Sequence, residues 1–325
     1  MKIDYVASEM GFEGKFPTDY QYMRVFETQI HHLDAIHLPV IKILEDDKVY
    51  GGNLLWNIGK GGFDKPYINL MYTKYHNTVE LLKQKFDKVT IYQDGEIGWW
   101  NNVDVKLQVW WFNQLSTADR IFVPNESDVK FYKGLFNTDI SVIRSVQLDD
   151  LIDVSILQPK EHRTIISGPF TYEYNGFIQT IIAHNFGAPI DVPPMGKDRM
   201  PKDSWEMSDN VGVNYLEYMT WTQWIHNLNK YSLGIMMTNA TASASFALNC
   251  ASLAIPCIGD ERADVMKICF PELCVNHFDT KKAVELAIKL KTDKNFYKLV
   301  STNGLSKYRK HFTKEKMLET MEKVY

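Results

Sequence analysis

Residues 236–261, MMTNATASASFALNCASLAIPCIGDE, decide the fold of this 325-residue chain. The apolar run at 233–237 predicts a buried strand, and a series of small and hydroxyl residues follows it. Residues 244–253 then favour a helix with Ser243 as its expected N-terminal cap, and 255–258 predict the next buried strand. A strand, a small-residue loop and a helix N-terminus together offer backbone N–H groups and the positive end of a helix dipole. This arrangement suits a bound phosphate.

Strands and helices are expected to alternate in this way along almost the whole chain. In the first half we predict strands at residues 3–7, 36–44, 89–92, 120–123 and 140–143, and helices at 20–32, 67–86, 104–115 and 126–135. In the second half we predict strands at 164–166, 188–192, 211–216, 233–237 and 255–258, and helices at 175–187, 221–228, 244–253, 281–290, 295–312 and 314–325. The Gly-rich residues 51–62 are interpreted as a connection.

This alternation predicts an α/β protein with two doubly wound, Rossmann-like domains that face a central cleft. A linker-like sequence at 150–162 separates the two series of elements. We therefore expect an N-terminal domain at 1–157, a C-terminal domain at 158–312, and a last helix at 313–325 that packs back on the N-terminal domain. In such sheets ligands bind beside the carboxyl ends of the strands, so the cleft is the expected site.

The composition is that of an ordinary soluble globular protein, with 45% hydrophobic and 23% charged residues. No run of about 18 apolar residues occurs, so a transmembrane segment is not expected. The N-terminus begins with a strand-like pattern and lacks the apolar core of a signal peptide. These features predict a cytoplasmic location, in the host cytoplasm if the protein is viral.

The charge distribution argues against a broad nucleic-acid surface. The net charge is −4, and residues 1–157 carry 16 Lys and Arg against 22 Asp and Glu. These totals give no globally basic face, although they leave room for a local basic patch.

Residue types that bind metals lack the spacing of metal ligands. The four cysteines have no C-x2-C spacing, and in a reducing compartment they are expected to be buried free thiols. His31, His32 and His226 have no partner at ligand spacing. We therefore expect neither a bound metal nor a cofactor.

Three stretches of the second half follow one another in an informative order. They are RTIISGPFTYEYNGFIQTIIAHNFGAPI at 163–190, VGVNYLEYMTWTQWIHNLNKYSLGIMMT at 211–238 and SASFALNCASLAIPCIG at 243–259. This order resembles the C-terminal domain of the GT-B glycosyltransferases, in which two Rossmann-like domains face each other and the C-terminal one holds a sugar nucleotide. The resemblance covers residues 163–325, and the N-terminal half is similar only as an alternating α/β domain.

The chain departs from this family at the donor site. Many retaining members carry two glutamates eight positions apart, where this sequence has Thr241 and Asn249. They also place an Arg and a Lys in the first loop of the domain, where Pro169 and Asn175 stand here. The resemblance therefore implies that the phosphate charge is met by the helix end or by other cations, the candidates being Lys197, Arg199 and Arg262.

The resemblance implies further roles in donor binding. Ser243, Ala244 and Ser245 would contact the diphosphate, and Asn249 would hydrogen-bond a ribose hydroxyl. Each also has a structural interpretation, because serines cap helices and an asparagine can lie at the edge of a packed helix. The remaining candidates are loop residues that allow close backbone approach and tyrosines where a nucleobase would rest, namely Gly168, Asn175, Gly176, Tyr215 and Tyr218.

Candidate catalytic and acceptor-binding residues lie in loops of the N-terminal half. An inverting transfer needs a general base near the acceptor hydroxyl, and Asp94, directly after a buried strand, is preferred over Glu9 and Asp19. A retaining enzyme would need no such base. The residues near Asp94 that are expected to contact the acceptor are Glu96, Trp99 and Trp100.

These features predict a glycosyltransferase that moves a sugar from a nucleotide donor, expected to be UDP-linked, to an acceptor hydroxyl without a metal. Three alternatives remain open: an enzyme that glycosylates hydroxymethylated bases of phage DNA, a nonhydrolysing sugar-nucleotide epimerase, and a nucleotide-sugar-binding protein without catalysis. The acceptor could be a glycan, a small molecule or a modified DNA base. The donor sugar, retention or inversion at that sugar, and the oligomeric state also stay open.

Overall fold

The computed structural model of the chain describes residues 53–56, 89–93, 105–147, 149, 152, 155, 160–193, 210–217, 219, 221–242 and 244–324. The chain divides into two compact units. The first ends at Val146 and also includes the C-terminal segment from Lys314, and the second runs from Gln147 to Thr313. Each unit contains one parallel β-sheet, as the alternating pattern predicts.

The sheet of the first unit has four parallel strands in the order β1-β2-β3-β4. Its register pairs Leu55 with Ile91, Ile91 with Ile121, and Ile121 with Ile140. The elements of this unit are β1 (Asn53–Trp56), β2 (Val89–Tyr92), α6 (Val105–Thr117), β3 (Arg120–Val123), α7 (Glu126–Lys133), β4 (Asp139–Val142) and α15 (Lys314–Val324). Its described core contains Leu115, Ile121, Phe122, Val123, Tyr132 and Ile140.

The sheet of the second unit has six parallel strands in the order β7-β6-β5-β8-β9-β10. Numbered along the chain, this order is 3-2-1-4-5-6, which is that of the doubly wound Rossmann fold. The strands are β5 (Thr164–Ile166), β6 (Ile190–Val192), β7 (Val213–Tyr215), β8 (Leu233–Met236), β9 (Cys257–Asp260) and β10 (Cys274–Val275).

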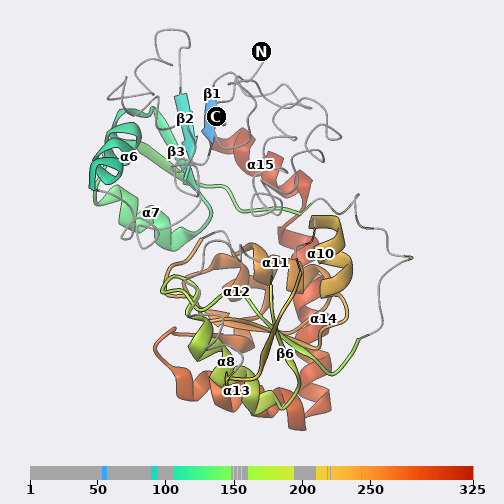
Figure 1. The fold of residues 1–325 in the computed structure, drawn as a ribbon. Helices are drawn as coiled ribbons and strands as arrows, with labels where there is room; N and C mark the ends of the chain where they lie inside the picture. Colours follow the sequence, from blue (N-terminus) through green and yellow to red (C-terminus); the bar gives the residue numbers. More distant parts are fainter. Residues whose placement is uncertain are drawn as a thin grey trace. The chain divides into compact units, whose positions relative to one another are not determined.

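The helices of the second unit pack against one another, and α14 contacts α11, α12 and α13. The helix α13 packs against α8, whereas α11 and α12 pack against α14 (Figure 1). The helices are α8 (Gly176–Phe186), α10 (Trp221–Leu228), α11 (Ser245–Ser252), α12 (Asp264–Cys269), the 3-10 helix η7 (Pro271–Leu273), α13 (Thr280–Thr292) and α14 (Lys294–His311). No helix among the described residues is both long enough and apolar enough to cross a membrane.

Local sequence signals explain these elements. The strands β5 and β8 are buried along their whole length, as parallel strands covered on both faces must be. Gly187 ends α8 in the left-handed conformation at φ 78°, which glycine adopts without strain. Asp279 and Asp293 cap α13 and α14, since their carboxylates accept the N–H groups of Lys282 and Phe296.

Most expected elements among the described residues are confirmed, and β2, β3, β5 and α10 have the predicted bounds. The strands and helices expected at 3–7, 20–32, 36–44 and 67–86 lie outside the described residues. The sequence did not predict β1, α12, η7 or β10, which are short elements.

Two predicted boundaries around α11 are corrected by the structure. The N-cap residue is Ala244 and not Ser243, so α11 begins at Ser245. The strand expected at 255–258 begins at Cys257, because Ile255 still closes the helix by donating its N–H to the carbonyl oxygen of Cys250 at 2.8 Å. The helix N-terminus, which the sequence predicts to bind a phosphate, is therefore formed by Ala244 and Ser245.

Candidate functional site

The candidate site lies at the carboxyl edge of the second sheet. The strand order reverses between β5 and β8, and two loops leave the sheet there. We call residues 167–175 the β5 loop and residues 237–244 the β8 loop, of which Ser243 lies outside the described residues. Open α/β sheets generally bind their ligands at such a reversal of strand order.

Two glycines allow the β5 loop to fold tightly on itself. A Cβ atom on Gly168 would overlap the ring of Tyr174, and one on Gly176 would lie 2.5 Å from the carbonyl oxygen of Pro169. Ser167 also stabilises the loop, because its N–H and its hydroxyl both donate to Oε1 of Gln179 at 3.0 Å. The loop's own atoms therefore require glycine at 168 and 176, whatever these positions do for a ligand.

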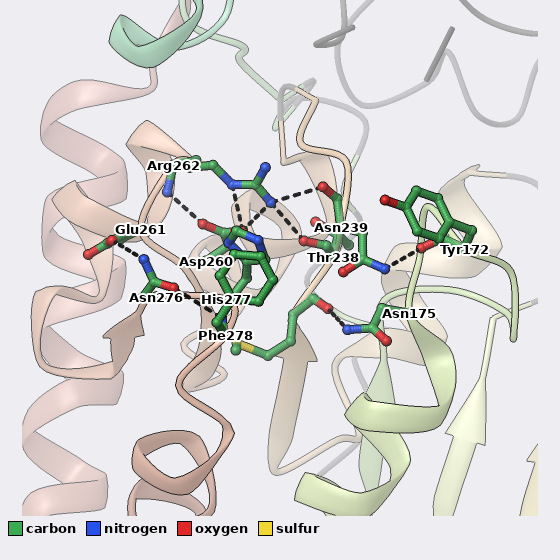
Figure 2. Close-up of polar contacts among 11 residues, drawn as sticks. Tyr172, Asn175, Thr238, Asn239, Asp260, Glu261, Arg262, Asn276, His277 and Phe278 are labelled. Carbon is green, nitrogen blue, oxygen red and sulfur yellow. Dashed lines mark hydrogen bonds and ion pairs between the residues drawn. The ribbon is translucent and has the colours of Figure 1, made fainter. Parts of the chain in front are cut away.

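Asn175 ties the β5 loop to the β8 loop. It is the N-cap residue of α8 and lies in the left-handed region at φ 54°, which asparagine tolerates better than most residues. Its Nδ2 donates to the carbonyl oxygen of Met237 at 3.1 Å (Figure 2). The sequence places Asn175 in a loop that allows close backbone approach to a donor, and the structure shows that its side-chain amide bonds within the protein.

The β8 loop has further hydrogen bonds to the β5 loop. The N–H groups of Asn239 and Ala240 both donate to the carbonyl oxygen of Glu173, at 2.9 and 3.3 Å. The Nδ2 of Asn239 donates to the carbonyl oxygen of Tyr172 at 2.8 Å. The two loops are thus joined through backbone groups, and a shift of one must move the other.

Arg262, just after β9, holds the β8 loop on the side away from Tyr172 (Figure 2). Its Nη2 donates to the carbonyl oxygens of Thr238 at 2.9 Å and Asn239 at 3.1 Å. Its Nε and Nη2 also donate to Oδ2 of Asp260, at 2.9 and 2.5 Å. The Asp260 side chain is completely buried, and Nδ1 of His277 lies 3.6 Å from its Oδ2. The predicted phosphate cation Arg262 therefore has protein partners for these donors.

The β8 loop leads into α11, whose N-terminus is the candidate phosphate-binding group. Its N-cap residue, Ala244, lies in the left-handed region at φ 55°. Ala244 has no side chain that could cap the N-terminus, and no acidic residue lies in the first turn of the described helix. The helix itself therefore offers no negative group to its own N–H groups and positive dipole end. Ser245 is partly exposed at the first helical position.

Asn249, the predicted ribose contact, has both ends of its amide bonded inside the protein. In the orientation that the hydrogen-bond network assigns, Nδ2 donates to Oε1 of Gln147 at 2.6 Å and to the carbonyl oxygen of Ser245 at 3.2 Å. Its Oδ1 accepts from Nε1 of Trp224 at 3.2 Å. Gln147 also donates to Oγ of Ser252 at 2.7 Å. With only 4% of Asn249 exposed, its described contacts join α10, α11 and Gln147, and its ribose contact stays a prediction.

Replacing Asn249 with alanine is expected to lower the free energy of unfolding by about 1–3 kcal/mol, because polar atoms of Trp224 and Gln147 would lose a buried partner. Urea denaturation followed by circular dichroism measures the effect. Asn185→Ala is the control in the same unit, since its side chain donates to Ile181 of its own helix at the surface. The Asn185→Ala substitution is expected to change the free energy of unfolding by no more than about 0.5 kcal/mol. Equal effects of the two substitutions would contradict a stabilising role of the Asn249 contacts.

Tyr215 ends β7, and its ring centroid lies 6.5 Å from that of Phe170 in the β5 loop. Both rings pack, partly buried, against the core of the second unit. Contact of Tyr215 with a nucleobase stays a prediction. The remaining predicted site residues lie outside the described part of the chain, namely Glu9, Asp19, Asp94, Glu96, Trp99, Trp100, Lys197, Arg199, Tyr218 and Ser243.

Sequence reasoning missed Glu173, Asn239 and Asp260. Glu173 accepts through its backbone carbonyl, and no residue pattern signals such a contact. Asp260 could have been found, because a carboxylate at the end of a buried strand with an arginine two positions later places an ion pair at the carboxyl edge of the sheet.

The cysteines are free, and Cys250, Cys257 and Cys269 are buried as expected. Burial raises the pKa of the Cys269 thiol to about 12 and that of Cys274 to about 11. Both thiols are therefore protonated at neutral pH. Among the described residues, no group of three or more His, Cys, Asp and Glu side chains is arranged to hold a metal ion.

Comparison with known proteins identifies the fold. No family model and no curated protein matches this chain. It is similar to sucrose-phosphate synthase from Thermosynechococcus elongatus, with a TM-score of 0.66 and 11% identity over 98% of this chain and 81% of that one. It is also similar to the trehalose-6-phosphate synthase OtsA, with a TM-score of 0.60 and 9% identity over 94% of this chain and 78% of that one. The pneumococcal O-GlcNAc transferase GtfA, solved with UDP and GlcNAc, gives a TM-score of 0.54 and 8% identity over 88% of this chain and 58% of that one.

These structures are GT-B glycosyltransferases, and this chain has the GT-B fold. The predicted fold class, an α/β protein with Rossmann-like parallel sheets, is confirmed. At identities of 8–11% the similarity establishes the fold and does not transfer the role of any residue.

Proposed function

We propose that this chain transfers a sugar from a nucleotide donor to an acceptor hydroxyl. One observation carries the proposal. In a GT-B fold, the N-terminus of α11, whose N-cap residue Ala244 has no capping side chain, follows a loop at the point where the strand order of the second sheet reverses. A helix N-terminus in this position is suited to the phosphates of a nucleotide, because its N–H groups and its dipole both favour negative charge.

The same helix end would assist the chemistry. Breaking the bond between the sugar and the nucleotide leaves negative charge on the departing diphosphate. Donors already oriented toward this charge stabilise the transition state more than the ground state, and so lower the barrier. We place the diphosphate against Ala244 and Ser245, which begin the described helix.

The acceptor side of the proposal rests on sequence. For an inverting transfer, Asp94 would take the proton of the acceptor hydroxyl, with Glu9 and Asp19 as the other candidates. Glu96, Trp99 and Trp100 would contact the acceptor.

We further propose UDP as the nucleotide part of the donor. The support is GtfA, similar in fold, which was solved with UDP and GlcNAc. Transfer without a metal and a cytoplasmic location belong to the same proposal. Glycosylation of phage DNA bases and epimerisation of the donor would use a similar donor site, and their products distinguish them from transfer to a glycan or small molecule.

A nucleotide-sugar-binding protein without catalysis is the second candidate. Thr241 and Asn249 occupy the positions where many retaining GT-B enzymes carry glutamates, so neither supplies a carboxylate. Thr241 is 2% exposed and Asn249 is 4% exposed. On this alternative a nucleotide sugar binds but is neither transferred nor hydrolysed.

Thermal-shift measurements with UDP-, GDP-, ADP-, CMP- and dTDP-sugars test the proposal. A ligand that binds only the native state, at 100 times its Kd, adds about 2.7 kcal/mol to the free energy of unfolding. We expect UDP-sugars to raise the Tm of the wild-type chain more than the other nucleotide sugars do, and EDTA to leave this shift unchanged.

Ser245→Asp is expected to abolish the UDP-sugar shift. A carboxylate at the first position of α11 interacts favourably with the helix dipole, by about 0.3–1 kcal/mol, so the helix should persist while the bound phosphate is repelled. Ser245→Asn introduces a side chain of the same shape as aspartate but without its charge. This variant should keep most of the rise in Tm caused by UDP-sugars.

The outcomes separate the candidates. If no nucleotide sugar shifts the wild-type Tm at millimolar concentration, the proposed function is wrong. A shift that Ser245→Asp leaves intact places the donor elsewhere than α11. A shift without any transferred or hydrolysed sugar by mass spectrometry, across glycan, small-molecule and hydroxymethylated DNA acceptors, supports the non-catalytic alternative.

A further inference from the structure

We propose that Arg262 is a positioning residue for the phosphate-binding end of α11, and that Asp260 holds it in place. The inference rests on the proposed function, because it concerns the same donor site. Arg262 acts by fixing the carbonyl groups of the β8 loop, and this role differs from the direct phosphate contact that the sequence suggests.

The β8 loop is fixed along both of its edges. On one edge, Nη2 of Arg262 bonds two successive carbonyl oxygens, those of Thr238 and Asn239. On the other edge, the N–H groups of Asn239 and Ala240 both donate to the carbonyl oxygen of Glu173. A peptide held at both its carbonyl and its N–H group cannot rotate freely. The direction in which the chain continues toward α11 is thereby set.

Asp260 balances the charge of Arg262. Its carboxylate is completely buried and receives both Nε and Nη2 of Arg262, whose side chain is 26% exposed. A buried carboxylate needs a counter-charge, and the guanidinium supplies it. The pair is close to neutral as a unit, so a phosphate nearby would gain little net attraction from it. What Arg262 offers the site is the direction of its hydrogen bonds.

Lysine lacks the geometry for this role. The guanidinium is planar and presents several N–H donors in fixed directions, so one group reaches Asp260 and two carbonyl oxygens at once. The ammonium group of lysine carries its donors on a single nitrogen at the end of a flexible chain. Arg262→Lys therefore keeps the charge and loses the arrangement, which separates the two roles experimentally.

Isothermal titration with UDP, on the full-length wild type, Arg262→Lys and Arg262→Gln, tests the inference. We expect both variants to weaken UDP binding by about tenfold, with the lysine variant no better than the glutamine variant. The salt dependence of Kd should match that of the wild type. A direct phosphate contact predicts the opposite: lysine keeps most of the affinity, and glutamine reduces the salt dependence.

A second variant distinguishes weaker UDP binding from a loss of folding. Arg262→Gln leaves Asp260 as a buried carboxylate without this counter-charge, so the double variant Asp260→Asn, Arg262→Gln removes both charges. We expect it to fold, to bind UDP as weakly as the single variants, and to show faster amide exchange at Asn239 and Ala240 than the wild type. A double variant with wild-type affinity and exchange would overturn the inference.

The experiments distinguish a failure of the proposed function from a failure of the positioning role of Arg262. If the wild type binds none of the nucleotide sugars, the proposed function fails and the inference falls with it. If the wild type binds UDP and Arg262→Lys binds equally well, the donor site stands and only the positioning role of Arg262 is wrong.

Discussion

Replacing Asp191 with alanine is expected to lower the free energy of unfolding of the second unit by about 3–5 kcal/mol, a large part of the stability of an ordinary domain. Asp191 lies on β6, and its side chain is completely buried. Its removal would leave an arginine, a tyrosine and an asparagine without their shared acceptor, and breaking a buried ion pair on one side is strongly destabilising.

Three side chains from different segments donate to Asp191. Arg163, directly before β5, places Nε 2.9 Å from Oδ2 and Nη2 2.7 Å from Oδ1. The hydroxyl of Tyr231, before β8, lies 2.6 Å from Oδ2, and Nδ2 of Asn214, on β7, lies 3.0 Å from Oδ1. The hydrogen bond to Asp191 raises the pKa of Arg163, while burial and then Asp191 raise that of Tyr231. One carboxylate thus connects the segments of four neighbouring strands.

Urea denaturation of the full chain, followed by circular dichroism, measures the effect. Asp279→Ala is the matched control, because it removes a carboxylate of the same unit that caps α13, at an expected loss of about 1 kcal/mol. Asp191→Asn keeps the shape of the side chain and one acceptor oxygen. Its loss in free energy of unfolding should therefore lie between those of Asp191→Ala and Asp279→Ala. If Asp191→Ala lost no more than Asp279→Ala, the buried network would not stabilise the sheet.

The architecture of the second unit could be predicted because its strongest signals are local. β5 and β8 are buried throughout and mostly apolar, since both faces of a central parallel strand are covered. Gly187 marks the end of α8, and the polar loop residues between strand and helix mark the carboxyl edge. These features do not depend on which distant residues they meet in the fold.

The strands that the sequence did not predict are short, and they are recognisable as strands only by their pairing with a neighbouring strand. β10 has two residues and becomes a strand by pairing Cys274 with Gly259 and Val275 with Asp260 on β9. β1, at 53–56, is a short apolar run in a glycine-rich stretch, which resembles a connection until its parallel pairing with β2 is known. A two- or four-residue run carries too little periodicity to identify it alone.

The place of the candidate site could be predicted, but its contacts could not. The strand β8 and the helix α11 lie within one residue of their expected bounds. Asn249, however, meets Gln147, and Arg262 meets the carbonyl oxygen of Thr238. These partners come from segments that only the folded chain brings together. Residue type alone cannot tell a polar side chain that faces a ligand from one that holds a loop.

Replacing Gly176 with alanine is expected to weaken UDP-sugar binding by about tenfold, which corresponds to about 1.4 kcal/mol, and to destabilise the second unit. At an open helix position alanine is favoured over glycine by about 1 kcal/mol, so the helix propensity alone predicts the opposite sign for stability. Here the new Cβ would lie 2.5 Å from the carbonyl oxygen of Pro169 and 3.0 Å from the backbone nitrogen of Phe170. Backbone atoms cannot rotate away, so the β5 loop must shift, and overpacking of this kind costs about 1–3 kcal/mol.

The shift reaches the proposed phosphate site because the β5 loop carries the acceptor Glu173 and the donor Asn175 that hold the β8 loop. Thermal-shift titration with UDP-sugar and urea denaturation measure the two effects on the same variant. Gly134→Ala in the first unit is the control, because its Cβ would come no closer than 3.3 Å, to the carbonyl oxygen of Phe131, and a smaller loss of binding is expected. A Gly176→Ala chain that is more stable than the wild type and binds UDP-sugar equally well would show that the contact with Pro169 is not tight. In that case the connected loops would not set the geometry of the donor site.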